Sequence, residues 1–168
     1  GGYTGNASSK GSAGGLIGVD ATVSSASSAG TIASYVVDNA TLNITGATVV
    51  TADTQVRQKG EATSNAGELV AAGASNSLVS SGMTTQAYLG SGVKLTGGSL
   101  SITATGNDDN FADTTAGAAG GISVAAASAT TLNTSTTVAE IRNGVAGRTI
   151  DLTSRGTGAF NITADHTA

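Results

Sequence analysis

Short runs of alternating apolar and polar residues, separated by glycine or asparagine, recur along the whole chain. Alternation with a period of two predicts β-strands whose apolar side chains share one face. The first clear strand is expected at Leu16–Val23, with Ile17, Val19, Ala21 and Val23 on one face. No stretch combines a helix cap, a long 3.6-residue period and a stop signal, so the sequence predicts an almost entirely β structure.

Polar stretches separate these runs, and such stretches usually form turns or loops. We therefore expect a bend at Ser24–Gly30 and polar connections at residues 53–66 and 105–115. The turn at Asp38-Asn39 follows from the preference of both residues for such positions. Turns and loops at these places predict short strands of about four to seven residues between them.

The chain repeats itself at a fixed distance. Tyr35 stands 53 residues before Tyr88, and Glu140 stands 52 residues after it, each within a similar short apolar block. A period near fifty residues predicts an array or solenoid. The expected division is residues 1–13 as a Gly/Ser-rich tail or the end of a preceding repeat, then repeats at 14–66, 67–119 and 120–168. Each repeat is expected to supply two or three coils.

Within the third repeat, strands are expected at Val138–Ile141, Thr149–Thr153 and Ala159–Ala164. Repeated short strands permit either a parallel β-helix or a β-sandwich of the kind found in pilin subunits. With 2 Phe, 3 Tyr and no Trp, the chain has little bulk to fill the gap of roughly 10 Å between two packed sheets. Ser, Thr and Asn also recur at matching places, where they can stack between coils. We predict an all-β, parallel β-helix of about three degenerate repeats and keep the sandwich as the alternative.

The charge, the cysteine count and the lengths of the apolar runs argue against several classes of function. A net charge of −4 argues against a nucleic-acid surface, which needs a basic face. Zero cysteines leave no disulfide framework or thiolate metal site. No apolar run approaches the roughly 20 residues of a membrane-spanning helix.

Three features resemble the repeat regions of large bacterial filamentous adhesins, the haemagglutinin-like and leukotoxin-type surface proteins exported by autotransporter or two-partner routes. They are Gly-Gly followed by alternating small apolar residues, an Ala-Tyr-Leu-Gly block at Ala87–Gly90, and a Leu-x-Ile-Thr-Ala strand at Leu100–Ala104. The resemblance covers roughly residues 14–164. It implies a right-handed parallel β-helix, an extracellular or bacterial cell-surface location, and a structural or adhesive role.

One acidic stretch is a candidate cation site. Asp108, Asp109, Asn110 and Asp113 stand close together in an expected loop, and Ca²⁺ prefers carboxylate and amide oxygens. The stretch lacks the order of a standard calcium loop, so a solvated turn is the alternative. No other cofactor is expected.

Tyr35 and Tyr88 share one repeat position, so stacked coils would bring their rings together. An outward ladder of rings could bind sugar, and packing against a neighbouring coil or subunit is the alternative. The single histidine, His166, is expected to be an exposed tail residue with no acid beside it.

The sequence favours a non-enzymatic structural protein, a segment or subunit of a bacterial extracellular filament or adhesin. Its expected partners are copies of itself or flanking repeats of a longer chain. A carbohydrate-binding module on the same scaffold, with host or surface glycans as ligands, is the alternative. A polysaccharide-processing β-helix enzyme is a third candidate, although the acids it needs are dispersed here.

Overall fold

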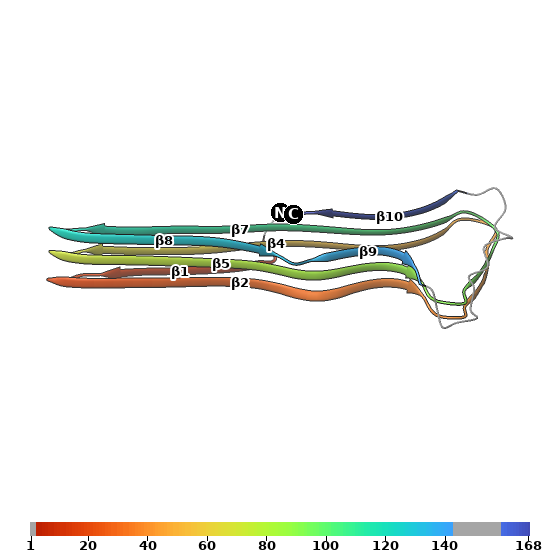
Figure 1. Cartoon of the computed structure of the whole chain (residues 1–168), viewed down its shortest axis with the longest axis horizontal. Coiled ribbons are helices and arrows are strands. Elements are labelled where there is room, and N and C mark those ends of the chain that lie inside the picture. Colours follow the sequence, from red (N-terminus) through yellow and green to blue (C-terminus); the bar gives the residue numbers. More distant parts are fainter. Residues whose placement is uncertain (1–2, 143–158) are drawn as a thin grey trace.

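The computed structural model of this chain describes residues 3–142 and 159–168 (Figure 1). These residues form parallel strands and contain no helix. The strands are β1 (Gly5–Ala13), β2 (Ile17–Val36), β3 (Thr41–Asn43), β4 (Thr48–Gly67), β5 (Val70–Leu89), β6 (Lys94–Thr96), β7 (Leu100–Ala119), β8 (Ile122–Asn133), β9 (Thr136–Ile141) and β10 (Phe160–Thr167). The expected strand Thr149–Thr153 lies outside the described residues.

The strands form two long sheets and one short sheet. One long sheet has the order β1-β4-β7-β10, and the other has the order β2-β5-β8, with β9 also pairing with β5. The short sheet pairs β3 with β6. Because each strand pairs in parallel with its counterpart one repeat later, the chain winds as a parallel β-solenoid, which confirms the predicted all-β, parallel architecture.

Each sequence repeat makes one coil. Ile17 pairs with Val70, 53 residues later, and Val70 pairs with Ile122, 52 residues later. The expectation of two or three coils per repeat was therefore wrong. It failed because β2, β4, β5 and β7 each contain 20 residues, which at about 3.3 Å per residue is roughly 66 Å of extended chain.

The predicted polar loops are strands. Ser24–Gly30 lies inside β2, residues 53–66 lie inside β4, and residues 105–115 lie inside β7. Polarity did not break these strands because the interior itself accepts polar side chains. Alternate residues of β4 and β5 are buried, and they include Ser, Thr, Gln and Gly as well as Ala and Val.

The interior between the long sheets is very thin. A Cβ atom added to Gly60 would lie 2.5 Å from Ser77 Oγ, and one added to Gly73 would lie 2.5 Å from the carbonyl oxygen of Gly117. Small side chains are therefore required where the sheets face each other.

Hydroxyl groups link the coils inside this thin layer. Thr22 Oγ1 donates to Ser75 Oγ at 3.2 Å, and Ser24 Oγ donates to Ser77 Oγ at 3.0 Å, each across one coil. Thr85 Oγ1 donates to Thr54 Oγ1 at 2.7 Å, across the gap between sheets. These bonds satisfy buried polar groups that would otherwise cost free energy. The Ser24–Ser77 pair joins like residues of successive coils, and the Thr22–Ser75 pair joins two hydroxyl residues.

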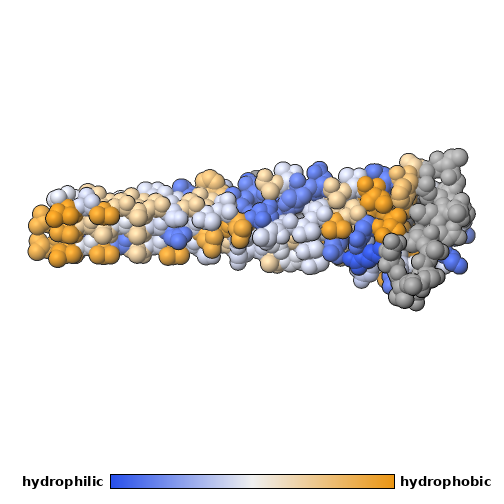
Figure 2. Space-filling view, in the orientation of Figure 1, coloured by the Kyte–Doolittle hydropathy of each residue, from blue (hydrophilic) through white to orange (hydrophobic). Residues whose placement is uncertain are grey.

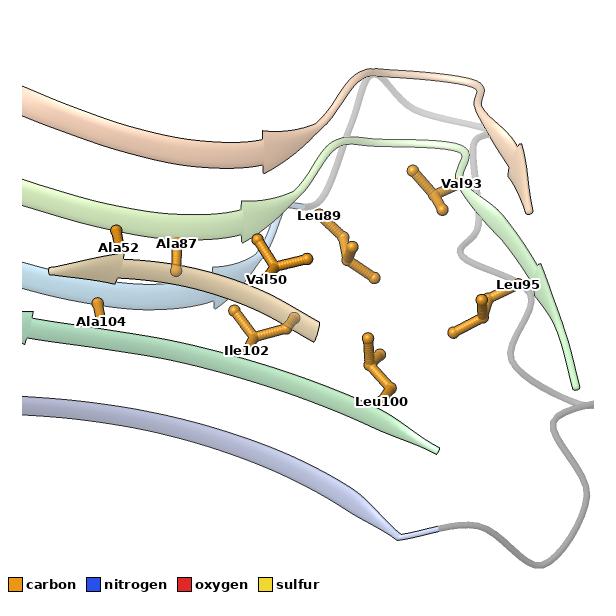
Figure 3. Close-up of a cluster of buried hydrophobic side chains, with 9 residues drawn as sticks. All are labelled: Val50, Ala52, Ala87, Leu89, Val93, Leu95, Leu100, Ile102 and Ala104. Carbon is orange, nitrogen blue, oxygen red and sulfur yellow. The ribbon is translucent and has the colours of Figure 1, made fainter. Parts of the chain in front are cut away.

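At one end the solenoid widens around a conventional apolar core (Figure 3). The short strands β3 and β6 supply a third side there, reached through turns in which Asn39, Gly92 and Gly97 have positive φ. The cluster holds the larger aliphatic side chains, all at most 5% exposed: Val50, Leu89, Val93, Leu95, Leu100 and Ile102, with Ala52, Ala87 and Ala104.

The thin interior makes a prediction about glycine. Replacing Gly73→Ala forces a methyl group against the Gly117 carbonyl, and such overpacking costs about 1–3 kcal/mol. Gly67→Ala is the matched control, because a Cβ at Gly67 meets no atom within 4 Å. We expect thermal unfolding, followed by circular dichroism, to show a lower Tm for Gly73→Ala only; equal Tm values would contradict the thin interior.

Candidate functional site

The aromatic ladder predicted from the repeat is present. Tyr35 and Tyr88 are register partners in β2 and β5. Their ring centroids lie 5.0 Å apart, and the ring planes differ by 5°. This is stacking at the spacing of successive coils.

Arg142 covers the other face of Tyr88. Its Cζ atom lies 3.3 Å from the centroid of the Tyr88 ring. Its Nε donates to Glu140 Oε1 at 2.7 Å, and its Nη2 donates to Gln86 Oε1 at 3.2 Å. The hydrogen bond to Glu140 raises the pKa of Arg142 above its ordinary value.

Sequence reasoning missed the role of Arg142. It treated Glu140, which pairs with Tyr88, only as a departure from the repeated tyrosine. The spacing of Glu140 and Arg142 in the sequence could have revealed this role, because residues two apart on a strand share a face. A basic residue two positions after the lost aromatic can therefore take the ring's place in the ladder.

The ladder offers a sugar one open aromatic face. Tyr88 is covered by Tyr35 on one side and by Arg142 on the other. Tyr35 is 53% exposed and lies at the edge of the sheet. The sugar-binding hypothesis therefore depends on Tyr35 and stays a prediction.

The four residues of the calcium hypothesis lie on β7 and not in a loop, so they alternate between the two sides of the sheet. Asp108 is 4% exposed and faces inward with Asn110, while Asp109 and Asp113 are exposed. Asp109 pairs with Arg57, with 3.0 Å between Nε and Oδ2. One ion cannot contact both pairs, and calcium binding by the inward pair stays a prediction.

His166 lies in β10 and is exposed, as expected, but it has an acid nearby, contrary to the expectation that no acid lies beside it. Its Nε2 is 3.6 Å from Asp108 Oδ2. Its ring nitrogens also contact Thr137 Oγ1 at 3.1 Å and Asn133 Nδ2 at 3.3 Å. His166 therefore contacts polar residues of the interior while remaining exposed itself.

A hollow of about 260 Å³ lies beside this histidine and is lined by Asp108, Asn110, Thr131, Asn133 and Ala168. Asp108 Oδ2 and Asn110 Oδ1 are buried there and accept no protein hydrogen bond. Buried oxygens of this kind normally bind water or a cation. Within the described part of the chain, no group of three or more His, Asp or Glu side chains could hold a metal ion.

Apolar side chains gather on the outer surface at the narrow end of the molecule (Figure 2). Ile17 and Val19 of β2 are 71% and 73% exposed, and Ile122 and Val124 of β8 are 67% and 64% exposed. The alternation at Leu16–Val23 thus marks one face of a strand, as predicted, but that face points outward. The inward positions there are Gly18, Asp20 and Thr22.

Comparisons with protein-family models, with curated proteins and with solved structures found no match to this chain. No helix among the residues placed in the structure is long and apolar enough to cross a membrane.

The ladder makes a prediction about its central ring. Tyr88→Ala removes both the aromatic stack, worth about 0.5–1.5 kcal/mol, and an exposed cation–π contact, worth about 0.5–1 kcal/mol. Tyr35→Ala removes only the stack. We expect urea unfolding at low protein concentration to show about twice the destabilisation for Tyr88→Ala. A larger effect for Tyr35→Ala would contradict the assignment, and Tyr88→Phe serves as the control that keeps the ring.

Proposed function

We propose that this chain is a non-enzymatic structural protein, a β-solenoid segment or subunit of a bacterial extracellular filament or adhesin. In this proposal it extends end to end by pairing with copies of itself or with flanking coils of a longer chain. The observation that carries the proposal is the set of parallel, in-register ladders, whose outer strands β2 and β8 pair with no further strand among residues 3–142 and 159–168.

The ladders suit a long, stiff rod. Each coil repeats the backbone pairing of the previous one over strands of 20 residues, so every added coil contributes a long row of hydrogen bonds. The thin interior of Ser, Thr, Ala and Gly side chains leaves little room for sliding between the sheets. Length and stiffness follow from repetition of one coil.

The edge strand β2 lacks the devices that normally prevent pairing. Natural proteins protect sheet edges with proline, charge, bulges or short strands. Here the chain has no proline, the edge strand β2 has 20 residues, and Asp20 is its single charged side chain. An edge of this kind supports further strand addition.

The extracellular and bacterial parts of the proposal rest on the resemblance in repeat style. The absence of cysteine and the low charge of the chain agree with such a setting.

Carbohydrate binding on the same scaffold is the second candidate. The exposed ring of Tyr35 favours it, because an open aromatic face on a rigid sheet can stack on a sugar ring. Host or surface glycans would then be the ligands.

Filament formation is tested by cryo-electron microscopy of the purified chain. We expect fibres whose power spectrum has a layer line at about 4.8 Å along the axis, the spacing of parallel strands. Monodisperse particles across a hundredfold range of concentration would overturn self-stacking.

Glycan binding is tested on a glycan array. If Tyr35 binds sugar, Tyr35→Ala should reduce the signal at least tenfold, which corresponds to about 1.4 kcal/mol. Val49→Ala is a control on the outer face of β4, where Val49 is 64% exposed. Equal signals for the wild type and Tyr35→Ala would remove this candidate.

A further inference from the structure

Two open edges belong to the same sheet. β5 lies in its middle, β2 pairs with one side of β5, and β8 and β9 pair with the other side. We propose that β2 of one copy pairs in parallel with β8 and β9 of another copy, with Ile17 beside Ile122 and Tyr35 beside Glu140. This contact rests on the proposed function and specifies its partner and register.

The backbone groups at the two edges fit this register. The carbonyls of Leu16 and Val36 accept bonds from the next coil. Amide direction alternates along a parallel strand, so in β2 the odd-numbered residues point their backbone groups to the open edge. In β8 and β9 the amides of Ile122, Thr134 and Arg142 point to β5, so there too the odd-numbered residues point outward.

This arrangement reproduces the bonding rule inside the chain. Between coils, the carbonyl of the residue that precedes a register partner accepts from the partner's amide in the next coil, as Leu16 does from Val70 and Leu69 from Ile122. With Ile17 beside Ile122, the inward-facing Ser123 carbonyl meets the Val19 amide of the second copy. A shift by one residue would bring the Gly18 or Asp20 amides to that place, and those amides point away from the edge.

The outward side chains would also continue in columns across the contact between the two copies, which we call the seam. Ile17, Val70 and Ile122 form one outward column, and Val19, Ala72 and Val124 form the next. A second β2 would place Ile17 and Val19 on top of these columns. The exposed apolar surface of the narrow end then becomes a continuous stripe along the stack.

Arg142 distinguishes this register from a shift by two residues. It lies 3.3 Å above Tyr88, and the Tyr35 ring of the next copy would lie two coil spacings, about 9.6 Å, above Tyr88. Roughly 6 Å remains between the guanidinium and that ring, which is the outer limit of a cation–π contact. The charged group would then lie between two tyrosine rings from different copies.

The second long sheet accommodates the same seam. β1 pairs with Gln58–Ala66, whose partners on β7 are Asn110–Ala118. β10 pairs with Leu100–Asn107 of the same strand. β1 of the second copy and β10 of the first therefore use different positions along β7.

A disulfide trap tests the seam. Ser25 and Thr130 are outward residues that the proposed register makes neighbours, because both are in register with Leu78. Within one chain they are two strand spacings apart, about 9.6 Å, which exceeds the roughly 7 Å limit for a disulfide. The chain has no cysteine of its own, so a Ser25→Cys, Thr130→Cys variant can form only bonds between copies.

We expect this variant, oxidised with diamide after assembly, to run as a ladder of covalent oligomers on a non-reducing gel. The matched control is Ser25→Cys, Thr131→Cys, because the inward-facing Thr131 lines the interior and should give no ladder. Three strands per copy in this sheet also predict an axial repeat of about 14 Å in the fibres. Arg142→Ala should raise the concentration needed for assembly about fivefold, while Arg142→Lys retains the cation.

The outcomes distinguish the proposed seam from the proposed structural function. Fibres with the 4.8 Å layer line but no ladder beyond the control would overturn this seam and leave the structural function standing. Fibres that form by lateral packing through the apolar face would also give no ladder of covalent oligomers, and they too would overturn the seam. A failure of the wild type to assemble would overturn both. An unchanged assembly concentration for Arg142→Ala would overturn the tyrosine–arginine contact alone.

Discussion

The structure depends on one constraint, the pairing of each residue with the residue one coil later. Because 20 consecutive positions of β2 and β5 pair in parallel, the length of a coil can change only in the connections between strands. The spacing of 53 and then 52 residues is therefore the coil itself. Residues far apart in sequence become neighbours of the same type, which is why Thr22 meets Ser75 and Tyr35 meets Tyr88.

This pairing also explains the unusual distribution of polarity. Two flat sheets held close together bury little volume, so Ser, Thr and Gly fill the interior, and hydroxyl bonds such as Ser24 to Ser77 offset the cost of burying polar groups. Among the described residues, leucine and isoleucine are buried only at the wide end, where β3 and β6 open a third side. At the narrow end, Ile17 and Val19 have no interior to enter and lie outside.

Two groups of larger side chains differ from this pattern of small, stacked residues. On the outer face, Arg142 replaces an aromatic ring and closes a column of tyrosines. The other group is a polar pocket lined in part by Asp108 and Asn110, with the exposed His166 beside Asp108. The first group lies at an open sheet edge, which connects it to assembly. The second holds buried oxygens of Asp108 and Asn110 that accept no protein hydrogen bond and could bind water or a cation.

The sequence by itself determined the β class, the repeat distance and the register of Tyr35 with Tyr88, because a solenoid copies its period directly into the chain. It did not determine which alternating face is buried, since Leu16–Val23 and Ser24–Gly30 belong to one strand whose polar face is inside. It also could not separate Asp108 from Asp109, or connect His166 and Arg142 to their partners. Those relations depend on how far apart the sheets lie and which strands end beside each other, and only the folded coils decide both.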